Sequence, residues 1–229
     1  MSELTITGRF DVAGVSLNYR VDGIGPRFLV CVHSEGARLE EWDSTIPELA
    51  DAFTILRYDL RGHGMSTQGK SPSHINNFVY ELMALVDHAQ IEQFDLAGCS
   101  LGGLIALRTA LAFNGRVRRL ILLSAVAEDA TNLDCYAAHG VMRGNDSSEE
   151  IKGIRCPTLI LTGEEDGDLS FRSAQLMHDR IAGSLLEILP GLRHPLLRCA
   201  PQVVAARMRR FLLDENPGVP PERSAKTNT

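Results

Sequence analysis

The spacing of apolar side chains changes along the chain from a period of two to a period of three or four and back. Around Gly14, residues 5–10 and 15–20 alternate apolar and polar side chains, which is typical of a β-hairpin. The continuously apolar run Phe28–Val32 predicts a strand that is covered on both faces. We expect further strands over Phe53–Tyr58, Phe94–Ala97, Leu120–Ser124, Thr158–Thr162 and Leu185–Leu189, and helices over Trp42–Ala50, Ile75–His88, Leu101–Phe113, Phe171–Ile181 and Pro201–Leu213.

Strands that alternate with helices predict an α/β fold with a mostly parallel sheet and helices on both of its faces. The hairpin would add an antiparallel edge. We expect one domain over residues 1–213, an irregular segment near 125–152, and a disordered tail over 214–229, which is rich in proline and polar residues. Ligands of such sheets bind at the carboxyl ends of the strands, so functional residues should directly follow strands.

Composition narrows the class of protein. The chain has 229 residues, 44% of them hydrophobic, which is enough for one sizeable core. Its formal charge of −6 and its scattered basic residues argue against nucleic acid or an anionic membrane as the main partner. No apolar run is long enough to span a bilayer, and the N-terminus lacks the pattern of a signal peptide.

Five cysteines, at positions 31, 99, 135, 156 and 199, show neither paired short spacings nor a zinc-site spacing. We therefore expect reduced thiols in a cytoplasmic protein, with no metal and no organic cofactor.

One serine stands at a predicted junction between a strand and a helix. The sequence Gly98-Cys99-Ser100-Leu101-Gly102 fits the pattern G-x-S-x-G, in which a sharp turn exposes a nucleophilic hydroxyl. Flanking glycines permit such a turn, and the free N–H groups at the start of the helix favour a developing oxyanion. The alternative interpretation is a serine that caps the helix.

A serine nucleophile needs a base and a group that orients the base. Of seven histidines, His194 follows the strand Leu185–Leu189 through the turn "PGLRH", which places it at the same sheet edge as Ser100. A histidine on a surface loop is the alternative. Asp166 follows the strand Thr158–Thr162 and is the candidate orienting acid. Carboxylates that remain alternatives on spacing alone are Glu164, Glu165, Asp168, Glu128 and Asp129.

Five segments in order along residues 15–213 carry a family resemblance. They read "CVHSEG", "RYDLRGHGMS", "GCSLGG", "CPTLILTGEEDGD" and "LPGLRHPLLRCAPQVV", and with them the chain resembles the α/β-hydrolases. The resemblance implies Ser100 as nucleophile, Asp166 as acid and His194 as base, in the chain order of that family. It also favours Asp166 over Glu165.

Within the superfamily, the chain is most similar to 3-oxoadipate enol-lactonases. The segment from "LNYRVDG" to "LRYDLRGHGMST" carries this similarity, and "YAAHGVMRGND" resembles the last helix of their cap. By this resemblance the backbone N–H groups of Leu101 and Glu35 form the oxyanion hole, with His33 and Ser34 beside the substrate. Arg143 and His139 are candidates to bind a substrate carboxylate, although a solvated helix face is the alternative for both.

The sequence departs from the family at two places. A glutamate, Glu35, replaces a small residue beside the expected oxyanion hole; it would have to point into solvent or pair with a base such as Arg38. Only about 30 residues separate the strands where the family inserts its cap. A short cap predicts an open site, weaker selectivity, or a homo-oligomer in which another subunit covers the site.

The sequence thus predicts a serine hydrolase that cleaves a small carboxylic ester or lactone through an acyl-enzyme. A protein of the same fold that binds a ligand or signals, with slow or no turnover, is the alternative.

Overall fold

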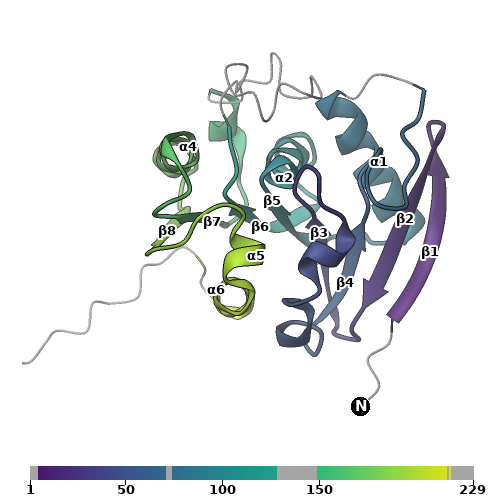
Figure 1. Ribbon diagram of the computed structural model, residues 1–229, viewed down its shortest axis with the longest axis horizontal. Coiled ribbons are helices and arrows are strands. Elements are labelled where there is room, and N and C mark those ends of the chain that lie inside the picture. Colours follow the sequence, from purple (N-terminus) through teal and green to yellow (C-terminus); the bar gives the residue numbers. More distant parts are fainter. Residues whose placement is uncertain (1–4, 71–73, 128–148, 216, 218–229) are drawn as a thin grey trace, which may run out of the picture.

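The computed structural model describes residues 5–70, 74–127, 149–215 and 217 of the chain (Figure 1). Its centre is an eight-stranded sheet with the order β1-β2-β4-β3-β5-β6-β7-β8. Strand β1 pairs antiparallel with β2, and β2 pairs antiparallel with β4, whereas the pairs from β4 through β8 are all parallel. The strands are β1 (Thr5–Val12), β2 (Val15–Asp22), β3 (Arg27–Val32), β4 (Phe53–Tyr58), β5 (Phe94–Cys99), β6 (Val117–Leu123), β7 (Thr158–Gly163) and β8 (Leu185–Leu189).

Helices cover both faces of this sheet, and each face has its own apolar core (Figure 1). The first core packs α1 (Ile75–His88), α2 (Leu101–Ala112) and α4 (Asp168–Arg180) against the strands. The second packs α5 (Leu196–Cys199), α6 (Pro201–Leu213) and the 3₁₀ turns η1 (Leu39–Trp42) and η2 (Ile46–Glu48) against the opposite face. A third 3₁₀ turn, η3 (Glu150–Gly153), precedes β7. The predicted α/β fold with its N-terminal antiparallel hairpin is confirmed.

The helix predicted over Trp42–Ala50 is wrong. The structure has two 3₁₀ turns there, η1 and η2, separated by a break. Pro47 lies in the first turn of η2 and has no N–H to donate to a preceding carbonyl, so a continuous α-helix cannot form. The Thr45 hydroxyl also donates to the Trp42 carbonyl at 2.7 Å, a local bond that competes with helical pairing. The short helix α5 was not predicted.

The five parallel pairings bring the carboxyl ends of β3 to β8 to one edge of the sheet. The segments that follow β3, β5, β7 and β8 contain the described residues that the sequence marks as chemical candidates. Most of the predicted cap region, residues 128–148, and residues 218–229 of the predicted tail lie outside the described part of the chain. Among the described helices, none has the length and apolar character needed to cross a membrane.

Candidate active site

Ser100 stands between the last residue of β5 and the first residue of α2. Its backbone has φ 54° and ψ −116°, a conformation that a residue with a side chain seldom adopts and that costs about 1–3 kcal/mol. The Ser100 N–H donates to the Leu123 carbonyl of the neighbouring strand β6 at 2.9 Å, which anchors the turn to the sheet. The strand-to-helix turn predicted from the G-x-S-x-G pattern is therefore present.

Two glycines allow this turn to be so tight. A Cβ atom on Gly98 would lie 2.1 Å from the Gly102 carbonyl oxygen, so the strand and the helix can approach only without a side chain there. A Cβ atom on Gly102 would lie 2.3 Å from the Val32 carbonyl oxygen and 2.6 Å from that of His33. Because Gly102 has no side chain, the turn can lie directly against the end of β3 and the loop that follows it.

His194 and Asp166 form a hydrogen bond across the loops that follow β8 and β7. The imidazole Nδ1 lies 2.9 Å from the Asp166 Oδ1. The Asp166 side chain is fully buried, whereas that of His194 is 36% exposed. The Thr162 hydroxyl is a more distant donor to the other Asp166 oxygen, at 3.4 Å. The acid is thus fixed within the protein, and the base faces the solvent side of the site.

The rival carboxylates lie elsewhere. Glu164 and Glu165 are exposed, and Glu164 accepts a hydrogen bond from the Gly191 N–H at 3.0 Å. Asp168 begins α4. Glu128 and Asp129 lie outside the described residues.

Cys99, which directly precedes Ser100, is fully buried. Burial raises the pKa of its thiol well above its usual range, and the negative charges of Glu41 and Asp166 raise it further.

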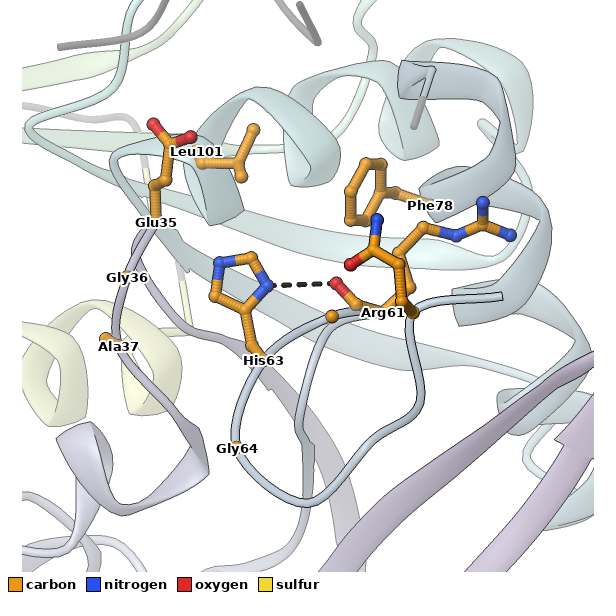
Figure 2. A pocket seen from close by; sticks show the side chains of 10 residues that line it. Glu35, Gly36, Ala37, Arg61, His63, Gly64, Phe78 and Leu101 are labelled. Carbon is orange, nitrogen blue, oxygen red and sulfur yellow. Dashed lines mark hydrogen bonds between the residues drawn. The ribbon is translucent and has the colours of Figure 1, made fainter. Parts of the chain in front are cut away.

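The two backbone donors predicted for the oxyanion hole border one cavity of about 270 Å³ (Figure 2). Leu101 is the first residue of α2, so its N–H has no acceptor within the helix. Glu35 lies across from it on the loop after β3, and Figure 2 shows its carboxylate beside the Leu101 side chain. The remaining lining residues are Gly36, Ala37, Arg61, Gly62, His63, Gly64, Gln68 and Phe78.

His33, a predicted substrate contact, joins two loops. Its ring is fully buried; Nδ1 lies 2.7 Å from the Ser34 carbonyl oxygen, and Nε2 accepts the Leu60 N–H at 2.9 Å. Burial lowers the pKa of this imidazole to about 4, so the ring is neutral at pH 7 with its proton on Nδ1. A substrate contact through either nitrogen would require one of these bonds to break.

Glu41 is a residue of this site that the sequence did not single out. Its carboxylate accepts the Ser34 N–H at 2.8 Å and the Ser34 hydroxyl at 2.9 Å. The sequence offers only a weak indication of this role. Glu41 directly precedes Trp42 and lies between Leu39 and Trp42, two buried apolar residues three positions apart. Nothing in that spacing reveals a contact with Ser34.

The remaining candidates are placed as follows. Arg38 forms an ion pair with Glu40 at 3.3 Å. His139 and Arg143 lie outside the described residues, so their proposed contact with a carboxylate stays a prediction. Within the described ranges, no three His, Cys, Asp or Glu side chains are grouped in a way that could hold a metal ion.

Comparisons with known proteins agree with this fold. The sequence model of the family described as alpha/beta hydrolase fold matches residues 27–139. The chain belongs to the α/β-hydrolase superfamily, and this membership supports a hydrolytic activity.

Individual relatives are distant. The chain is 24% identical to 3-oxoadipate enol-lactonase 2 of Acinetobacter baylyi, over 76% of this chain and 85% of that one. It is 33% identical to an uncharacterized protein of Mycobacterium tuberculosis, over 82% of this chain but only 54% of that protein, so it spans about half of this relative. The structure superimposes on a hydrolase from Pseudomonas aeruginosa with a TM-score of 0.82 at 24% identity, covering 91% of this chain and 98% of the other. That likeness concerns the fold.

Proposed function

We propose that the protein is a serine hydrolase that cleaves a carboxylic ester or lactone, with Ser100 as nucleophile, His194 as base and Asp166 as orienting acid. One observation carries this proposal: a serine in a strained strand-to-helix turn lies at the same sheet edge as a histidine bonded to a buried aspartate. A serine that only caps a helix has no need of such a backbone, because an ordinary helix cap forms without strain.

In this proposal each group has one task. Asp166 holds Nδ1 of His194, which leaves Nε2 to take the proton of the Ser100 hydroxyl as the oxygen attacks the substrate carbonyl. The N–H groups of Leu101 and Glu35 bind the resulting oxyanion, and each donor contributes about 3–4 kcal/mol to the transition state. His194 then protonates the leaving oxygen, and a water activated by the same ring releases the acid.

The proposed substrate is a small molecule. The cavity that borders Leu101 and Glu35 has a volume of about 270 Å³, at the low end of ligand pockets. Among the described residues, its lining includes two large apolar side chains, Leu101 and Phe78, which favours a short acyl group over a long one. The relative named 3-oxoadipate enol-lactonase supports a lactone among the candidates. Whether the site prefers an anionic substrate depends on residues 128–148.

The test is hydrolysis of p-nitrophenyl acetate and a panel of small lactones by Ser100→Ala. We expect a loss of at least about 10⁴-fold in kcat, with an unchanged circular dichroism spectrum. Ser124→Ala is a matched control, because Ser124 is also buried with a positive φ of 47° and directly follows the neighbouring strand β6. Hydrolysis that survives in Ser100→Ala, or is lost equally in Ser124→Ala, would overturn the assignment. Acylation of the wild-type chain without release of product would favour the ligand-binding alternative.

A further inference from the structure

The Glu41 carboxylate uses both of its oxygens on one residue of the oxyanion loop, which we define as residues 33–37. Ser34 donates its N–H to Oε2 at 2.8 Å and its hydroxyl to Oε1 at 2.9 Å. Ser34 is 5% exposed, and η1, the turn that holds Glu41, is anchored by the buried Leu39 and Trp42. The loop is therefore tied to a fixed element of the second core.

The carbonyl of Ser34 is held as well. It lies 2.7 Å from the Nδ1 of His33 and accepts the Ala37 N–H at 3.2 Å. This carbonyl and the Glu35 N–H belong to the same planar peptide unit, in which they point in opposite directions. Whatever fixes Ser34 thereby fixes the direction of the Glu35 N–H, one of the two proposed oxyanion donors.

Charged groups as well as Ser34 lie around Glu41. Burial raises the pKa of the Glu41 carboxyl, while the hydrogen bonds from Ser34 lower it. Arg38, Glu40 and Arg198 border with Glu41 a cavity of about 630 Å³.

We propose that Glu41 is a positioning residue of this site: through its two hydrogen bonds to Ser34 it orients the oxyanion loop, and with it the Glu35 N–H. This proposal rests on the proposed function of Ser100 and His194.

The test uses paired substitutions. Glu41→Leu removes both carboxylate oxygens that accept from Ser34, whereas Glu41→Gln keeps one acceptor oxygen for the Ser34 N–H and places an NH₂ group opposite the Ser34 hydroxyl. In Glu41→Leu we expect kcat to fall about 10- to 100-fold with KM within about threefold of wild type, because a displaced oxyanion donor acts on the transition state. Glu41→Gln should recover much of this loss. An unchanged kcat in Glu41→Leu would overturn the positioning role.

If Glu41→Leu does not fold, Ser34→Ala serves instead: it removes one of the two bonds to Glu41 and should lower kcat with little change in KM. A kcat equal to that of wild type in Ser34→Ala would contradict the inference. Glu40→Gln, at the neighbouring carboxylate, is the control and should leave kcat nearly unchanged. Hydrolysis that survives in Ser100→Ala would overturn the proposed function, whereas an unchanged kcat in Glu41→Leu beside an inactive Ser100→Ala would overturn the positioning role alone.

Discussion

The two halves of the site are built with different rigidity. On the side of the oxyanion loop, buried hydrogen bonds connect the loops after β3 and β4: the buried His33 spans both, and the Asp59 carboxylate accepts the N–H groups of Leu39 and Met65, each at 2.8 Å. On the side of the base, one hydrogen bond to Asp166 holds a ring that is 36% exposed. Groups that stabilise developing charge must be fixed before the reaction, whereas the base moves protons between partners.

We expect kcat to be most sensitive to substitutions on the side of the base, where fewer contacts hold the catalytic group. In Asp166→Asn, the His194 ring loses its charged acceptor and the tautomer that presents Nε2 to Ser100, so we expect kcat to fall about 10³- to 10⁴-fold. The unfolding free energy should change little by comparison. Steady-state hydrolysis of p-nitrophenyl acetate, together with urea denaturation, measures both quantities.

Glu165→Gln is the matched control, since Glu165 is the exposed neighbour that spacing alone could not exclude. Its kcat should stay within about twofold of wild type. A large loss of kcat in Glu165→Gln and a small one in Asp166→Asn would show that Asp166 is not the orienting acid.

We expect the unfolding free energy to be most sensitive to substitutions on the side of the oxyanion loop. Arg61, on the loop after β4, donates its Nε–H to Glu81 of α1 at 2.9 Å, and both side chains are 1% exposed. Arg61→Leu would leave the Glu81 carboxylate buried without its ion-pair partner, which costs about 3–5 kcal/mol of unfolding free energy. Urea denaturation at pH 7 checks this value.

The double variant Arg61→Leu/Glu81→Leu distinguishes the pair from the packing around it. Replacing both partners by apolar groups should restore most of the lost stability, because no unpaired charge stays buried. A double variant as unstable as the single one would show that the guanidinium packs the loop in some other way.

The smallest expected effect is a pH dependence carried by His33. Burial lowers the pKa of this imidazole from 6.5 to about 4, so between these values the unfolded chain binds a proton that the folded chain does not. Stability from this residue is fully present above about pH 6.5 and falls as the pH decreases toward 4, by up to about 3 kcal/mol.

His33→Gln removes the titration and provides the comparison. The difference in unfolding free energy between wild type and this variant should shrink as the pH decreases from 7 to 4.5, measured by urea denaturation at each pH. Buried carboxyls such as Glu41 and Glu81, whose pKa burial raises, act in the opposite direction, but they are common to both proteins. A difference that does not vary with pH would contradict the neutral, buried state of His33.

The sequence predicted the parts of this molecule that depend on local pattern. Alternating and continuous apolar runs identify the strands, and the segment Ile75–His88 has the bounds that its helical spacing predicts. The prediction of a helix over residues 42–50 was wrong because Pro47 lacks an N–H and the Thr45 hydroxyl bonds to a backbone carbonyl. The spacing of apolar residues carries no information on such individual hydrogen bonds.

The site divides in the same way. Ser100, Asp166 and His194 could be predicted as candidates because each lies in the segment after a strand, and parallel strands end at one sheet edge. The choice of Asp166 over Glu165 came from the family resemblance. Glu41 could not, since its contact with Ser34 arises only when a 3₁₀ turn folds back on the preceding loop. The contacts of His33 also depend on the tertiary fold, because its ring accepts a hydrogen bond from a backbone N–H that is 27 positions away in the chain.

The most direct measurement of the central claim is mass spectrometry of the intact protein after treatment with a fluorophosphonate. A nucleophilic Ser100 predicts one covalent adduct per chain, found on the peptide that contains residue 100, with labelling abolished in Ser100→Ala and strongly slowed in His194→Gln. An unlabelled wild-type chain, or an adduct that persists at another residue in Ser100→Ala, would contradict the account.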